Sequence, residues 1–154
     1  MKMLKSVVLF LALNFLTLYI GVSLYGEGGT SNWYANLNRA PWEPPGWVFG
    51  FAWSVIMICF AFYMSALWKN TKNKKTITFL FLLQIILNIS WNPTFFNFHF
   101  VLPSLVIICL LTILISYIFY KYWIIIKLQS ILLLPYILWL FIATSLNGYI
   151  FLYN

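Results

Sequence analysis

Long apolar stretches separated by short polar segments make up most of the sequence. A helix that rises about 1.5 Å per residue needs about 20 residues to cross a hydrocarbon core of about 30 Å. Five stretches meet that requirement, at residues 4–25, 47–68, 76–96, 101–120 and 128–151. Little chain remains outside them. The pattern therefore predicts one all-α membrane domain over residues 1–154, a bundle of five transmembrane helices.

One segment between the spans is much longer than a turn. Residues 33–53 hold four tryptophans, three prolines and Arg39, the only arginine of the chain. Prolines fix φ, so the loop has a defined shape, and indoles offer flat apolar area with one donor each. We expect a short helix over residues 33–38, capped by a polar residue among 30–32 and ended by Pro41. The segment resembles a lid or platform for a flat, apolar ligand.

Charge gives the expected orientation. Only 7% of the residues are charged, against about 25% in an ordinary soluble domain, and the formal net charge is +7. With five spans, both acids, Glu27 and Glu43, fall on the same side as Arg39. The other side carries Lys2, Lys5, Lys69, Lys72, Lys74, Lys75, Lys121 and Lys127. The positive-inside rule then places the N-terminus in the cytoplasm and the first loop and the C-terminus outside.

The lysines are thus expected to orient the protein in the lipid bilayer, and no nucleic acid is expected as a partner. The composition suits a bacterial plasma membrane. An alternative for the first span is a signal peptide cleaved near residues 21–23. Because this apolar run is longer than the core of an ordinary signal peptide, we favour a retained helix.

The third span carries a polar stripe. Gln84, Asn88 and Asn92 are four residues apart, so they lie on one face of a helix, with Trp91 beside them. Amides exposed to lipid would lack hydrogen-bond partners at substantial cost, so this face must point into the bundle. Two interpretations stay open at this point. The stripe either holds helices together by hydrogen bonds or lines a ligand cavity.

Two other spans carry tryptophans away from the membrane surface. Trp53 lies about two turns into the second span, deeper than the belt where membrane tryptophans usually sit. It is expected to face a cavity or a partner helix. In the last span, Trp139, Ala143 and Asn147 share a face, on which the small residue leaves room beside the indole.

The fourth span is aliphatic apart from Cys109, Thr112 and Ser116, which are spaced as one helical stripe. Such a stripe is typical of a close-packing seam, either within the bundle or at the face of a homodimer. Cys109 and Cys59 show no metal-ligand or redox spacing. They are interpreted as small buried hydrophobic residues.

Several kinds of chemistry have no support in the sequence. No acid or base lies deep in a span, which argues against an ion-coupled pump. Motifs for phosphate binding, serine hydrolases and metalloproteases are absent, and no metal site is expected. His99, the only histidine, could serve as an axial haem ligand, but a single histidine in an outer turn is more often a solvated loop residue.

Three blocks of residues follow one another along almost the whole chain. The first comprises Trp33, Tyr34, Leu37, Pro41, Trp42, Pro44, Pro45, Phe49, Gly50 and Trp53. The second comprises Asn88, Trp91, Asn92, Pro93, Phe95 and Phe96. The third comprises Pro135, Tyr136, Trp139, Ala143, Thr144 and Asn147. Together these blocks resemble the TspO/MBR family, the tryptophan-rich sensory proteins and translocator proteins.

This resemblance implies a five-helix bundle, often a homodimer, with a cavity under the first loop. Family members bind tetrapyrroles such as protoporphyrin IX, and no intrinsic cofactor is implied. Some bacterial members degrade the porphyrin in light and oxygen through tryptophans that match Trp53 and Trp139, which would be the catalytic residues. Arg39 would lie within reach of the propionates. The implied cavity lining is Tyr34, Pro44, Trp53, Gln84, Asn88, Trp91, Trp139, Ala143 and Asn147.

Two departures from the family pattern bear on the ligand. Sterol-binding relatives carry a basic residue after an aromatic one at the end of the last helix, and residues 147–153 hold none, which argues against sterol recognition. Ile56 and Met57 stand where many members have leucine and tyrosine, so one hydroxyl is missing from the expected cavity wall. Two other functions stay open, namely a carrier of small apolar metabolites and a regulatory protein whose aromatic loop docks a partner.

Overall fold

The computed structural model describes residues 3–154, so Lys2, one of the lysines used to assign the orientation, lies outside the described residues. The helices are α1 (Met3–Ser23), α2 (Asn32–Ala35), α3 (Gly46–Asn70), α4 (Lys74–Asn92), α5 (Val101–Ile126) and α6 (Leu134–Tyr153). A short 3-10 turn, Gly28–Thr30, precedes α2. One π-helical turn, Pro93–Asn97, extends α4, and the 3-10 segment Lys127–Leu133 joins α5 to α6.

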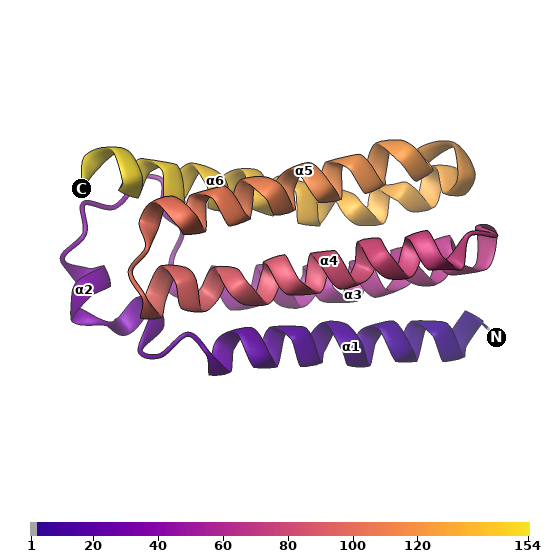
Figure 1. The fold of residues 1–154 in the computed structure, drawn as a ribbon, viewed down its shortest axis with the longest axis horizontal. Helices are drawn as coiled ribbons and strands as arrows, with labels where there is room; N and C mark the ends of the chain where they lie inside the picture. Colours follow the sequence, from indigo (N-terminus) through magenta and orange to yellow (C-terminus); the bar gives the residue numbers. More distant parts are fainter. Residues whose placement is uncertain (1–2) are drawn as a thin grey trace.

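The apolar helices confirm the predicted architecture. Four continuous helical segments are long and apolar enough to cross a membrane: Met3–Thr30, Gly46–Asn70, Lys74–Asn97 and Val101–Tyr153. The last segment has 53 residues and contains both α5 and α6, which fold back on each other in Figure 1. The protein is therefore an integral membrane protein with five long helices.

The long helices lie side by side, and an odd number of them places the chain termini at opposite ends of the bundle (Figure 1). The segment that contains α2 lies at the same end as the C-terminus, as the span count predicts. The α3–α4 and α5–α6 connections lie at the other end, with the N-terminus.

The half of the bundle near the N-terminus has a solid core. Its centre is the second part of α3, where Met57, Phe60 and Tyr63 have no measurable exposure. Ile115 and Ile118 of α5 are also buried almost completely and belong to the same cluster. The interior of this half is therefore filled by packed side chains.

Polar residues within the spans join neighbouring helices. The Asn14 side chain of α1 donates a hydrogen bond of 2.9 Å to the carbonyl oxygen of Met57 in α3. The hydroxyls of Thr112 and Thr144 lie 3.2 Å apart between α5 and α6. At least the Thr112 part of the fourth-span stripe is therefore a seam within one chain. Cys59 and Cys109 are half-buried free thiols, so the expectation that both are buried was wrong.

The first loop differs in detail from the prediction. Ser31 caps α2, because its hydroxyl oxygen accepts a hydrogen bond of 3.1 Å from the Tyr34 N–H. The helix ends at Ala35 rather than near residue 38, so Pro41 does not end it. Pro45 immediately precedes α3, where its missing N–H costs nothing.

Candidate ligand-binding cavity

A partly open cavity of about 1210 Å³ lies in the half of the bundle that carries the first loop. Side chains of all five long helices line it, together with the loop segment that includes Leu37–Pro45 and covers its outer end. Binding sites for small molecules commonly have volumes of about 300–1,000 Å³. This cavity is therefore large enough for a large planar ligand.

The membrane-embedded wall of the cavity is aromatic. Trp53 of α3, Trp91 of α4 and Trp139 of α6 all line it, and so does Phe49. Phe49 meets Trp139 edge to face, with ring centres 5.2 Å apart. Edge-to-face pairs hold each other in fixed orientations. The indoles therefore form a preorganised apolar surface around the space.

Tyr136 ties two amides together below this wall. Its hydroxyl oxygen accepts hydrogen bonds of 2.8 Å from both the Gln84 and the Asn88 side-chain amides. The Tyr136 ring also packs edge to face on Trp53, with ring centres 5.8 Å apart. Asn88 lines the cavity, whereas Gln84 is not among the lining residues. The predicted stripe does point inward, because Gln84 and Asn88 join α4 to α6 and the third amide, Asn92, also lines the cavity.

Asn147 acts as a second polar junction. Its Oδ1 accepts hydrogen bonds of 3.1 Å from the Trp91 indole N–H and from the Ser104 hydroxyl. Trp91 also stacks on Phe95 with an interplanar angle of 7°. Asn147 is buried and does not line the cavity, but it fixes the orientation of an indole that does.

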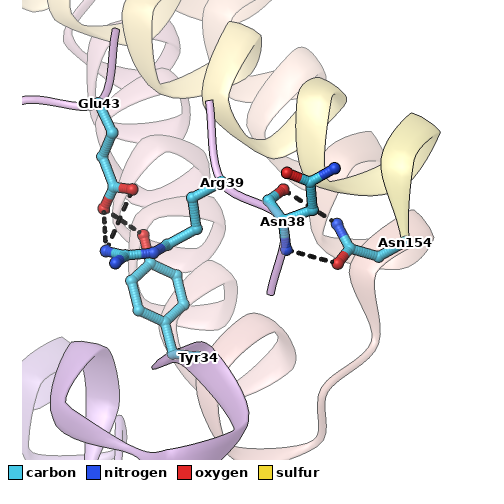
Figure 2. A network of polar contacts seen from close by, with 5 residues as sticks. All are labelled: Tyr34, Asn38, Arg39, Glu43 and Asn154. Atoms are coloured by element: carbon cyan, nitrogen blue, oxygen red, sulfur yellow. Dashed lines mark hydrogen bonds and ion pairs between the residues drawn. The ribbon is translucent and has the colours of Figure 1, made fainter. Parts of the chain in front are cut away.

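The polar groups at the mouth of the cavity come from the first loop (Figure 2). The Tyr34 hydroxyl donates a hydrogen bond of 2.8 Å to Glu43 Oε1, and Arg39 Nη1 lies 3.3 Å from both carboxylate oxygens. The guanidinium also lies 5.4 Å from the centre of the Tyr34 ring. Burial raises the pKa of Tyr34 well above its usual value, and the Glu43 carboxylate adds to that rise. Tyr34 is therefore a neutral donor at physiological pH.

Two contacts fasten the loop to α6. The backbone N–H of Asn38 donates to Asn154 Oδ1 at 2.8 Å, and Asn154 Nδ2 donates to the Asn38 carbonyl at 3.1 Å (Figure 2). Nearer the second span, the Trp42 indole N–H donates a hydrogen bond of 3.1 Å to the Ser145 hydroxyl. The loop is therefore held over the cavity at two points and not only by its covalent ends.

Most of the residues proposed from the sequence come together around this one space. The lining includes Tyr34, Arg39, Pro44, Trp53, Asn88, Trp91, Trp139 and Ala143. Gln84 and Asn147 lie outside the lining and contact residues of the wall instead. Their spacing identified the correct helix faces, but periodicity does not show which neighbour fills the space in front of a side chain.

Other parts of the cavity were missed from the sequence. Leu18, Val22 and Tyr25 of the α1 end line it, as does Glu43. Aliphatic residues of an apolar span give no signal for a ligand site. Glu43 carries a weak sequence signal for a site, because it is one of only two acids in the chain and follows the only arginine, Arg39, by four residues.

His99 does not lie in the cavity lining. It is exposed in the turn before α5 and stacks on Trp33, with ring centres 4.1 Å apart and an interplanar angle of 15°. Within residues 3–154, no three histidine, cysteine or acidic side chains gather as metal ligands. The cavity can therefore offer stacking surfaces, amide and hydroxyl groups, and one guanidinium and one carboxylate at its mouth.

A membrane bundle of five long helices with a loop-covered aromatic cavity defines the class of protein. A model of the TspO/MBR family matches residues 6–153. The chain is 31% identical over 159 positions to the tryptophan-rich protein TspO of Archaeoglobus fulgidus, covering 100% of this chain and 97% of the relative. It is 32% identical over 161 positions to the TspO of Bacillus cereus, with both chains covered completely.

A human relative is similar over a shorter stretch. The human translocator protein is 30% identical over 128 positions, which cover 80% of this chain and 75% of the relative. The family match and the full-length similarity together show that this chain belongs to the TspO/MBR family.

Proposed function

We propose that this protein binds protoporphyrin IX or a related tetrapyrrole in the cavity beneath the first loop. The observation that carries the proposal is a cavity of about 1210 Å³ whose wall presents three indoles, while its charged groups, Arg39 and Glu43, stand at the mouth. A porphyrin has the matching distribution, because its macrocycle is flat and apolar and its two carboxylates lie at one edge. The macrocycle would lie against Trp53 and Trp139.

Arg39 supports an orientation of the porphyrin in which its propionates lie at the mouth of the cavity. A guanidinium carries five N–H donors, and both contacts to Glu43 involve Nη1. Nε and Nη2 are therefore available for a propionate, to which arginine binds with charge-assisted hydrogen bonds. The Glu43 carboxylate already accepts from both Tyr34 and Arg39, which reduces its repulsion of an incoming anion.

We further propose an enzymatic form of this function. Light would excite the bound porphyrin, dioxygen would act as the oxidant, and the indoles of Trp53 and Trp139 would take part in the oxidation as the catalytic residues. Both indoles line the same cavity, so both can contact one bound ring. The reaction needs no acid–base pair, and none is available in the membrane-embedded wall.

The test is an illumination experiment on protein that has first been saturated with protoporphyrin IX in the dark. Trp53→Phe and Trp139→Phe should each abolish the light-dependent loss of the porphyrin spectrum while changing the dissociation constant less than about tenfold. Trp123→Phe is the matched control, because Trp123 lies on α5 and is absent from the cavity lining. If both cavity variants degrade porphyrin at the wild-type rate, the enzymatic form is wrong.

Other outcomes select the alternative functions. Saturable binding without degradation would leave a sensor or a carrier, and flux into proteoliposomes above the protein-free leak would identify the carrier. Without saturable binding, a docking role would be favoured, because Trp42 and Trp47 of the loop region are exposed. A partner captured by the wild type would then be lost with Trp42→Ala.

We also infer an orientation and an oligomeric state. The N-terminus would be cytoplasmic, because the lysines gather at the end opposite to the first loop. The family resemblance favours a homodimer, and the lysine distribution favours a bacterial plasma membrane. Labelling of single cysteines placed at residues 72 and 27 with an impermeant reagent in intact cells would test the orientation. Only the second position should react.

A further inference from the structure

A second hollow lies on the outside of the bundle, far from the ligand cavity. It is an apolar groove of about 230 Å³ between α1 and α4, with Trp68 of α3 at its base. Its lining consists of Leu9, Phe10, Leu13, Trp68, Ile77, Thr78, Phe81, Leu82 and Ile85. The single hydroxyl, that of Thr78, donates to the Lys74 carbonyl at 3.0 Å and is satisfied within its own helix. The groove thus offers no polar group to a ligand.

Each of the two helices that form the groove carries a lysine at the same end of it, Lys5 on α1 and Lys74 on α4. Lys5 precedes Leu9 by four residues on α1, and Lys74 precedes Thr78 by four on α4, so each lies on the helix face that lines the groove, one turn nearer the membrane surface. Lys74 Nζ lies 5.0 Å from the centre of the Trp68 ring, which holds it at the rim.

These lysines have no carboxylate nearby in the sequence to neutralise them. The chain has two acids, and both lie in the first-loop region at the opposite end of the bundle. Lys69, Lys72 and Lys75 add further positive charge around the α3–α4 connection. The lysine end of the groove therefore needs an anion from outside the chain, while the groove itself needs an apolar group.

We propose that the groove, with Lys5 and Lys74 at its end, binds one anionic phospholipid of the adjacent leaflet. An acyl chain would fill the groove between the two helices over about 12 Å, the length of the lining segment from Ile77 to Ile85 at about 1.5 Å per residue. The phosphate and the charged headgroup would lie between the two ammonium groups. Basic pockets at the cytoplasmic ends of transmembrane helices are a known form of lipid recognition.

The probes are dioleoyl phosphatidylglycerol and dioleoyl phosphatidylcholine, which share acyl chains and differ in headgroup charge. The detergent-held full-length protein would be titrated with each lipid, and bound copies counted by native mass spectrometry. We expect one phosphatidylglycerol to be retained at concentrations at least tenfold lower than phosphatidylcholine. Equal retention of the two lipids would overturn the proposal.

Two pairs of variants distinguish lipid binding at this groove from a general attraction of anionic lipids to the lysines of the protein surface. Lys5→Gln with Lys74→Gln should weaken the first phosphatidylglycerol by about fivefold per lysine, whereas Lys121→Gln with Lys127→Gln should leave it unchanged. Leu82→Trp should block the groove, and Phe79→Trp should not, because Phe79 is exposed on the same helix outside the groove. Equal weakening by both lysine pairs would contradict the proposal. A dimer that forms only when lipid is removed would also contradict the proposal, because it would show that a second copy of this chain occupies the groove.

Discussion

The two parts of α3 belong to one apolar helix but have different surroundings. Its first part, from Gly46 to Ser54, lines the cavity, whereas Ile56, Met57 and Phe60 are buried almost completely in the solid core. The first part faces a space that the loop covers, whereas in the second part Phe60 packs on Phe81 of α4 and on Tyr136 of α6. The comparison teaches that one helix contributes its first part to the wall of the cavity and its second part to the packed core.

The largest expected effect lies in the solid half. Phe60→Ala removes a fully buried ring from tight packing and should lower the free energy of unfolding by about 3–5 kcal/mol. Phe49→Ala is the matched control in the first part of α3. Phe49 lines the cavity, so its truncation enlarges an existing space instead of creating a new one in the core. Its cost should be less than half as large. Thermal unfolding in detergent measures both, and equal costs would refute the division.

A smaller effect is expected at the boundary between the halves. Tyr136→Phe leaves two buried amide donors, on Gln84 and Asn88, without their common acceptor, which should cost about 1–3 kcal/mol of stability. Tyr63→Phe is the control, since it removes one hydrogen bond of 3.3 Å to the Ile118 carbonyl, which keeps its helical partner. A Tyr136 variant as stable as the Tyr63 variant would show that the amide junction is not important.

The smallest effect is expected at the loop fastening. Asn154→Ala removes both hydrogen bonds between Asn154 and Asn38, which are exposed and therefore contribute about 1 kcal/mol or less to global stability. Hydrogen exchange is the sensitive measurement, because the Asn38 amide should exchange faster while the α3 core amides stay unchanged. Tyr153→Ala is the control at the neighbouring position. An unchanged Asn38 amide would mean that the loop is held by other contacts.

The sequence was sufficient for the fold class and for most of the cavity. Apolar run length predicts the five helices, and the spacing of Asn88 and Trp139 identifies inward faces. Helix ends were less accurate. The predicted fourth span ends at residue 120, yet α5 continues to Ile126, since helical hydrogen bonds do not stop at the edge of the hydrocarbon.

Contacts between distant residues could not be predicted. Asn38 and Asn154 are 116 positions apart, and neither belongs to a periodic pattern that would show the pairing. Likewise, nothing in the spacing of Asn147 shows that Trp91 and Ser104 occupy the space in front of it. Such contacts depend on how three helices converge, and a pattern along one helix contains no information on that convergence.

The most direct test of the account is whether the cavity itself binds the porphyrin. Ala143 is buried at the cavity wall, and its neighbour Ile142 is exposed outside the lining. Protoporphyrin IX would be titrated in the dark against the wild type, Ala143→Phe and Ile142→Phe, with tryptophan fluorescence as the readout. The account predicts saturable quenching in the wild type and in Ile142→Phe, and at least tenfold weaker binding in Ala143→Phe. Equal affinity in all three proteins would place the porphyrin elsewhere and contradict the central claim.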